Sequence, residues 1–226
     1  MHRNESRSLC AVVCSLFLLL SAYSAVAGAE QAAPMSSSFP GPLWEVVAPV
    51  GGTASVANAH LTLNVPGGSN HDALLPSNQA LRVVQPIGND DFDVSIKIDS
   101  PVSATAVGTS QGLMVLADEK NFFTFALMTD GTNISLTART VSAGVATTVF
   151  DNASFNEYHN PMYLRLNRTG SVYAAYYSVD GVVWTQATSF TYAVAPTLIG
   201  PFAGNYNSTP ARAVPVIMAI NWFDIL

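Results

Sequence analysis

Tyrosine, arginine and threonine side chains recur at alternate positions in two stretches of this sequence, and together they have the chemistry of a sugar-binding surface. Aromatic rings stack on the C–H faces of sugars, while planar and hydroxyl groups bond to the sugar hydroxyls. On one open sheet they would form a binding face. The alternative is an ordinary solvated face stabilised by cross-strand pairs. The residues concerned are Tyr163, Arg165, Tyr176, Thr137 and Arg139.

A second group of candidate ligand-binding residues lies in segments rich in glycine, serine and asparagine. These are His71, Tyr158 and Tyr206, each with an asparagine one or two positions away. Loops at one rim of a sandwich often carry binding residues. Asparagine and aspartate also stabilise turns by bonding to their own backbone, which is the alternative role. His71 and His159 would have to pair for metal or acid–base chemistry, and their spacing does not indicate such a pair.

Carboxylates are the groups needed for glycoside hydrolysis, which typically uses two of them. The acidic pairs of this sequence favour other roles. Asp90-Asp91 follows Gly88-Asn89 and opens a strand, and Asp118-Glu119 is typical of a hairpin tip. The sequence also lacks a G-x-S-x-G nucleophile motif, a phosphate loop and a dinucleotide fingerprint. We therefore predict a protein without enzymatic activity.

β-Strands are the elements that would position these side chains. Residues 161–186 contain three strand-forming runs, separated by Arg168-Thr169-Gly170 and by Asp180-Gly181. Asp-Gly between such runs is a strong hairpin signal, because a two-residue turn requires positive φ and glycine adopts it easily. The stretch predicts an antiparallel meander.

Alternation with a period of two assigns the two sides of each strand. Residues 92–99 are the clearest case, with apolar side chains at every second position from Phe92 to Ile98. By the same rule Leu164 and Leu166 face the core. A register shift of one residue would exchange the inward and outward side chains of a strand. The residues expected together on one non-core face are Tyr163, Arg165, Tyr176, Ser135, Thr137 and Arg139.

The remaining strands follow from composition and turn signals. Residues 111–117 are apolar at successive positions, as expected of a strand covered on both faces. Residues 122–128 and 133–140 flank Asp130-Gly131, a further hairpin signal, and residues 214–226 supply the last strand. Helical periodicity is absent outside the N-terminal segment. The pattern predicts an all-β fold, a two-layer antiparallel β-sandwich.

Several stretches resemble a known family. The pattern L-R-L-x-R-x-G followed by Y-Y-S-x-D-G-x-x-W is similar to the concanavalin A-like jelly rolls of the DUF1349 kind, which include laminin-G-like secreted proteins and C-terminal domains of some β-xylosidases. Further matches are Phe92-Asp93-Val94, residues 111–115 and 117–122, and the closing residues 222–225. The resemblance implies a jelly roll, often with carbohydrate binding, and it suggests that Tyr177 and Trp184 point inward.

The resemblance also bears on catalysis and on metal ions. Catalytic members of the concanavalin A-like group carry acids in an E-x-D-x-x-E arrangement, which this sequence lacks. No cofactor is evident, although many lectin-like sandwiches hold a structural calcium ion through carboxylate and backbone oxygens. Glu45 and Asp224, on the first and last strands, are the acids that we expect to approach each other. Trp44, Trp184 and Trp222 have apolar neighbours, which favours core packing over a sugar platform.

The N-terminal segment indicates export. Residues 1–29 combine Arg3 and Arg7 with an apolar stretch and small residues near its end, which is typical of a secretory signal peptide. An uncleaved anchor is the alternative. Both cysteines lie within this segment, so the mature chain would have no thiol. Residues 30–42 are expected to form a flexible leader, and residues 43–226 a single domain with nothing appended.

Composition limits the partners. The net charge is −6, which argues against nucleic acid or an anionic membrane surface, and we expect no membrane association after signal cleavage. Our leading hypothesis is a secreted, extracellular or cell-surface protein that binds carbohydrate or another extracellular polymer. The alternatives are a structural or assembly protein that self-associates through its faces or edges, and an unrecognised polysaccharide hydrolase or lyase.

Overall fold

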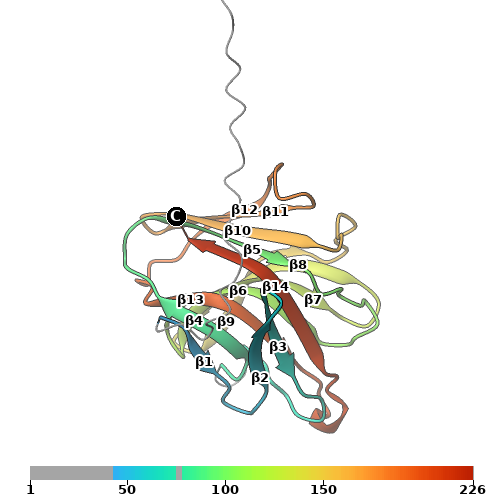
Figure 1. Ribbon diagram of the computed structural model, residues 1–226. Coiled ribbons are helices and arrows are strands. Elements are labelled where there is room, and N and C mark those ends of the chain that lie inside the picture. Colours follow the sequence, from blue (N-terminus) through green and yellow to red (C-terminus); the bar gives the residue numbers. More distant parts are fainter. Residues whose placement is uncertain (1–42, 75–77, 226) are drawn as a thin grey trace, which may run out of the picture. The chain divides into compact units, whose positions relative to one another are not determined.

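The computed structural model describes residues 43–74 and 78–225, and their regular structure is almost entirely β-strand (Figure 1). The expected signal peptide and leader lie outside the described residues. No helix in the described part is long and apolar enough to cross a bilayer. The elements are β1 (Glu45–Val47), β2 (Thr53–Ala57), β3 (His60–Val65), β4 (Leu81–Pro86), β5 (Phe92–Ile98), β6 (Thr109–Asp118), β7 (Asn121–Thr129), β8 (Ile134–Ser142), β9 (Val145–Asn152), β10 (Met162–Thr169), β11 (Val172–Ser178), β12 (Thr185–Thr191), β13 (Leu198–Asn205), the short 3-10 helix η1 (Pro210–Arg212) and β14 (Val216–Ile225).

The strands form two seven-stranded sheets. One, which we call the β6 sheet, has the order β1-β4-β13-β6-β7-β8-β9, and the other, the β10 sheet, has the order β12-β11-β10-β5-β14-β3-β2. Neighbouring strands run antiparallel in both sheets. The predicted all-β class and the two-layer antiparallel sandwich are confirmed.

The main core lies between the sheets and follows the predicted alternation. On β5 the side chains of Phe92, Val94, Ile96 and Ile98 are buried, and the intervening residues are only partly covered. Burying an aliphatic side chain contributes about 1.5–3 kcal/mol, so this pattern determines which side of each strand faces inward. The partners of β5 in the core include Leu164 and Leu166 of β10 and Leu113, Phe123 and Phe125 of the β6 sheet.

A second apolar cluster covers the outer side of the β6 sheet. Met114 and Leu116 of β6 pack there, together with Phe122 and Phe202, and against Ala73 and Ala80. Leu113 and Val115 of the same strand face the main core. The expectation that residues 111–117 form a strand covered on both faces is therefore confirmed.

The predicted meander corresponds to β10, β11 and β12. Gly170 in the first turn has φ of +60°, and Gly181 in the second has φ of +74°. The second turn is longer than the two residues predicted, since residues 179–184 separate the strands. Asp180 shapes this loop by accepting hydrogen bonds from the backbone N–H groups of Val182 and Val183, both at 2.8 Å.

Candidate functional site

The β10 sheet turns Tyr163, Arg165 and Tyr176 away from the core. Arg165 of β10 lies opposite Tyr176 of β11, and Tyr163 lies opposite Lys97 of β5. The intervening Leu164 is fully buried in the core. The predicted orientation of these residues is correct, because the strict alternation of β10 leaves only one apolar side to bury.

Trp222 also lies on this outer side, where core packing had been predicted. An irregularity in the pairing of β14 with β5, between Ile220 and Trp222, shifts the register by one residue. Trp222 then pairs with Lys97, and its ring lies 5.5 Å from that of Tyr163, at an interplanar angle of 65°. The bulge exchanges the inward and outward positions, so Phe223 and not Trp222 packs against the core.

Trp184 is the second tryptophan that was wrongly placed in the core. It ends the long second turn of the meander, outside the strand alternation. The centre of the Arg165 guanidinium lies 5.6 Å from the Trp184 ring and 5.9 Å from the Tyr176 ring, distances typical of cation–π contacts. Trp44 and Tyr177, in contrast, do pack against the main core as predicted. We call the outward set, Tyr163, Arg165, Tyr176, Trp184 and Trp222, the aromatic face.

Asp93 positions Arg165. Its carboxylate accepts hydrogen bonds from Nε of Arg165, at 2.7 Å, and from Nη2. Asn167 donates a third at 3.3 Å. The hydrogen bonds with Asp93 raise the pKa of Arg165 above its ordinary value, against the opposing effect of partial burial, so the side chain stays charged. The acidic cluster at residues 90–93 therefore includes an arginine-orienting group in addition to turn residues.

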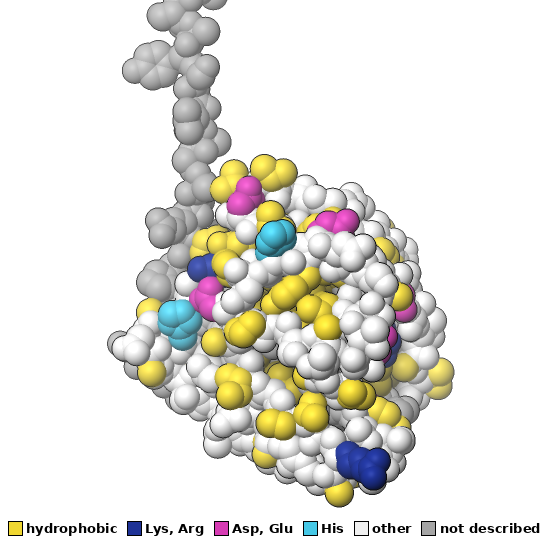
Figure 2. Space-filling view, turned by 90° about the vertical axis from the view of Figure 1, so that its right-hand side faces the viewer, with side chains coloured by type: hydrophobic (Ala, Val, Ile, Leu, Met, Phe, Trp, Pro, Cys, Tyr) yellow, Lys and Arg dark blue, Asp and Glu magenta, His cyan; other side chains and the backbone are white. Residues whose placement is uncertain are grey.

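The Lys97 amino group beside the aromatic face is also paired with a carboxylate. The Lys97 amino group lies 3.0 Å from one carboxylate oxygen of Asp99, and His60 Nε2 lies 3.0 Å from the other. Lys97 also lies 5.9 Å from the centre of the Tyr163 ring. Elsewhere, the side of the molecule drawn in Figure 2 carries few charged groups among neutral polar and hydrophobic ones. Such a surface suits an uncharged ligand with many hydroxyl groups.

The turn at Gly181 supports the Tyr163 ring from the side. A Cβ atom at Gly181 would lie 2.8 Å from the ring, and the residue has φ of +74°. Glycine is the residue that permits both this close approach and this backbone conformation. The Tyr163 ring thus packs against both the turn and Trp222.

Thr137 and Arg139 do not join the aromatic face, and the prediction of one shared face is wrong for them. Both belong to β8, which lies in the β6 sheet. They face its outer side, where Thr137 is buried and Arg139 lines a small cavity with Asp72. Burial raises the pKa of Asp72, an effect that hydrogen bonding and the charge of Arg139 partly offset. Alternation placed these side chains outside the core correctly, but the sheet to which β8 belongs depends on long-range pairing.

The three loop candidates hold the loops together. His71 is fully buried, with Nδ1 lying 3.1 Å from the side-chain oxygen of Asn205, so it does not reach solvent. The hydroxyl oxygen of Tyr158 accepts a hydrogen bond from the backbone N–H of Val102 at 2.7 Å. Tyr206 is exposed, and its backbone N–H bonds to the carbonyl of Gly108. Tyr158 and Tyr206 thus both anchor the connection between β5 and β6.

The expected approach of Glu45 to Asp224 does not occur. Glu45 pairs with Val84 in the β6 sheet, whereas Asp224 pairs with Ser95 in the β10 sheet. The pair that would support a structural calcium ion is therefore not formed. Within residues 43–74 and 78–225, no cluster of three or more His, Asp or Glu side chains is arranged to hold a metal ion.

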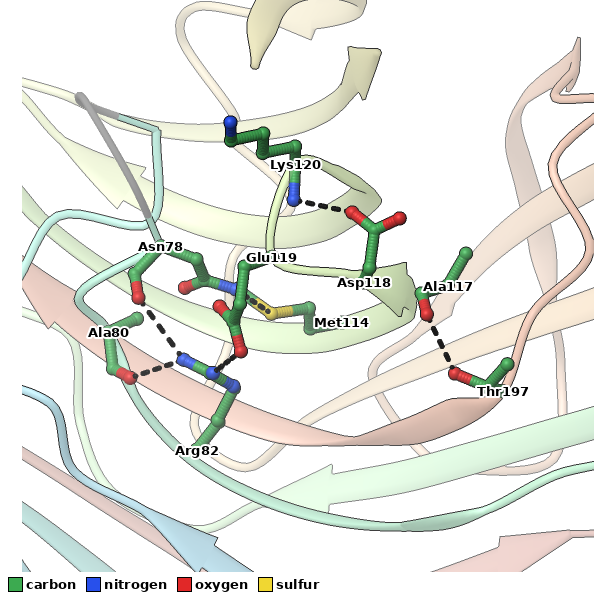
Figure 3. Close-up of polar contacts among 9 residues, drawn as sticks. All are labelled: Asn78, Ala80, Arg82, Met114, Ala117, Asp118, Glu119, Lys120 and Thr197. Atoms are coloured by element: carbon green, nitrogen blue, oxygen red, sulfur yellow. Dashed lines mark hydrogen bonds and ion pairs between the residues drawn. The ribbon is translucent and has the colours of Figure 1, made fainter. Parts of the chain in front are cut away.

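The Asp118-Glu119 hairpin tip is confirmed, but Glu119 has a partner that the sequence did not reveal. Arg82 of β4 is buried, and it forms an ion pair with Glu119. Figure 3 shows the Arg82 guanidinium directed toward this carboxylate and toward the carbonyl groups of Asn78 and Ala80. Burial lowers the pKa of Arg82, which the charge of Glu119 partly offsets.

Comparisons with known structures support the same fold. A functionally unknown protein from Saccharomyces cerevisiae has a TM-score of 0.64 at 14% identity, with 81% of this chain and 94% of that chain covered. The GH43 BlXynB protein from Bacillus licheniformis has a TM-score of 0.64 at 19% identity, with 82% and 37% covered. The xylan β-1,4-xylosidase from Bacillus halodurans has a TM-score of 0.58 at 12% identity, with 76% and 34% covered. The chain thus spans little more than a third of the two Bacillus proteins.

Sequence comparison assigns the family. A search of curated protein sequences gives no significant match. A family model described as the β-xylosidase C-terminal concanavalin A-like domain matches residues 49–224, which include all but the first strand of the sandwich. The match is to a C-terminal domain and not to a catalytic one. The chain therefore belongs to the family of β-xylosidase C-terminal concanavalin A-like domains.

Proposed function

We propose that this chain is a secreted, non-catalytic protein that binds carbohydrate on its aromatic face. The observation that carries the proposal is the convergence of four aromatic rings and Arg165 from β10, β11, β14 and the 179–184 turn. Sugar rings stack on exposed aromatic faces, and the guanidinium donates hydrogen bonds to hydroxyl groups.

The charge distribution supports a neutral polysaccharide as the ligand. Asp93 compensates Arg165, and Asp99 compensates Lys97. A face whose basic groups are already paired with carboxylates offers little attraction to polyanions and retains hydrogen-bonding capacity for hydroxyl groups. The Bacillus halodurans relative is a xylan β-1,4-xylosidase, so xylan is the first polymer that we would test.

The same ion pairs support a non-catalytic role. Asp93 and Asp99 flank the face, and both carboxylates are held by basic side chains. Hydrolysis by a pair of carboxyl groups requires one of them to carry a proton. Both oxygens of each carboxylate are engaged by basic side chains, so neither group is free to contact a glycosidic bond.

Truncating the tryptophans is expected to abolish most of the binding. Trp222→Ala and Trp184→Ala should each weaken affinity for soluble xylan by about tenfold or more, since each removes a stacking surface. Tyr206→Ala is the matched control, because it removes an exposed aromatic ring from a loop and should leave affinity unchanged. Affinity electrophoresis against xylan, glucomannan and β-glucan would measure these effects. Equal retardation of all three variants and the parent chain would contradict the proposal, as would no retardation of the parent.

A second candidate function, self-association, is favoured by the edge strand β9. Its first residues, Val145 to Val149, are exposed and uncharged, with Val145 67% exposed. Uncharged edges of this kind can pair with another chain, and a lysine in the strand opposes such pairing. The full chain is then expected to form dimers or larger species in light scattering, and Val149→Lys to be monomeric. A parent chain that stays monomeric at about 100 μM, a concentration that detects dimers with an association free energy of about 5.5 kcal/mol or more, would exclude this function.

A further inference from the structure

A pocket of about 410 Å³ opens at one end of the sandwich, away from the residues of the aromatic face. It lies between the connection of β5 to β6, the first residues of β6 and the start of β14. Pockets for small ligands in proteins measure roughly 300–1,000 Å³, so this volume suits one or two sugar rings.

Gln111 contributes to this pocket a side-chain amide that has no hydrogen-bond partner among the described residues. It pairs on β6 with Leu127 and Ala203, which face the main core, so its side chain points between the two sheets. The residue is 4% exposed and lines the pocket. Among the described residues its amide has no hydrogen-bond partner, and the amide atoms are not fully enclosed, so they are open to the pocket. The amide offers two donors and one acceptor to a ligand.

The other lining groups complete a neutral, mixed surface. The Ser100 hydroxyl accepts a hydrogen bond from the backbone N–H of Ala219 at 3.0 Å, which leaves its own O–H free to donate. Pro101, Val102 and Ile217 supply apolar contact, and no charged residue lines the pocket. This combination fits a ligand with hydroxyl groups on its rim and C–H groups on its face.

Hydrogen bonds fix the loop between β5 and β6 that forms one wall of the pocket. Tyr158 holds the backbone of Val102, the Ala106 N–H bonds to the Ser103 carbonyl, and the Gly108 N–H bonds to Thr129. A preformed wall lowers the ordering cost of binding, which favours a small ligand. The contact of Tyr158 with Val102 thus serves this pocket and not the aromatic face.

We propose that this pocket binds a neutral disaccharide unit, or the end of a neutral glycan chain, with the Gln111 amide bonded to its hydroxyl groups. The inference takes its ligand class from the proposed function but assigns a separate site. A polysaccharide could then be held along the aromatic face while a chain end enters the pocket at the rim.

The test is an NMR titration of the full chain with xylobiose, cellobiose and maltose. At least one disaccharide should shift the amide signals of residues 100–111 and 215–217, and Gln111→Met should weaken that binding about tenfold or more. Because Gln111→Met removes an unpartnered amide and keeps its volume, it should not lower the unfolding temperature. Trp222→Ala should leave disaccharide binding at the pocket intact.

Each outcome separates the two proposals. If the chain binds xylan but no disaccharide shifts the NMR signals of the pocket residues, this inference is wrong and the proposal for the aromatic face is unaffected. If a disaccharide shifts the NMR signals of the pocket residues but the chain binds no polysaccharide, the proposed function is wrong and this inference is unaffected. Unchanged affinity in Gln111→Met, or binding of a valine- and proline-rich peptide in place of a sugar, would also overturn it.

Discussion

Replacing Gly200 by alanine is expected to leave little folded protein. Gly200 lies in β13, between β4 and β6 in the middle of the β6 sheet. A Cβ atom there would overlap the carbonyl oxygen of Val83 and lie 2.9 Å from the Cα of Val84. Both are backbone atoms, so relief requires separating two central strands. We expect a loss of about 4 kcal/mol or more, within the exceptional range for one substitution.

A matched control isolates the steric effect from the general cost of losing glycine. Gly144 has φ of +81°, and a Cβ there would meet no atom within 4 Å. Gly144→Ala should therefore cost only about 1–2 kcal/mol, the strain of a left-handed alanine. Soluble yield and urea unfolding followed by far-ultraviolet circular dichroism would compare the two. Similar unfolding midpoints for both variants would show that β4 and β13 are not packed as described.

Removing Glu119 is expected to destabilise the fold, although its side chain is 58% exposed. Its partner Arg82 is 1% exposed and bonds through Nη1 to the carbonyl groups of Asn78 and Ala80. Glu119→Ala would leave a buried guanidinium without its ion-pair partner. Breaking a buried pair in this way costs about 3–5 kcal/mol, and we expect about 2–3 kcal/mol because Glu119 is partly solvated.

A double-mutant cycle tests the charge argument. Arg82→Met removes the buried charge and keeps most of the volume, so the double variant with Glu119→Ala should be less destabilised than the sum of the two single variants. Lys120→Ala, on the same hairpin tip, is the control and should change stability by less than about 0.5 kcal/mol. Additive losses in the cycle would mean that Arg82 and Glu119 contribute independently.

The accurate predictions from sequence concern single strands and their turns. The alternation of β5 and β10 correctly placed Phe92, Ile96 and Leu164 in the core, and residues 111–117 were correctly assigned as a doubly covered strand. Asp130-Gly131 marks a real hairpin. These features depend on side-chain period and glycine dihedral angles, which a few neighbouring residues determine.

The errors concern residues whose position depends on a neighbouring strand. The bulge in β14 moved Trp222 to the outer face, and the long turn after β11 did the same for Trp184. Neither the bulge nor the long turn changes the apolar residues around these tryptophans, so the neighbouring sequence favoured a core position for both rings. The sequence did not indicate the burial of Arg82, since its ion-pair partner Glu119 lies 37 residues away.

By itself, the sequence determined the all-β class, the inward side of most strands and the pairing of adjacent strands through short turns. Tertiary structure alone decided which sheet each strand joins, and so separated Thr137 and Arg139 from Tyr163 and Arg165 while bringing two tryptophans to the same face. The physical reason is the distance along the chain over which the determining interactions act. Alternation and turn geometry are determined by local steric constraints and burial, whereas strand order and register shifts result from hydrogen bonding between segments far apart in the chain.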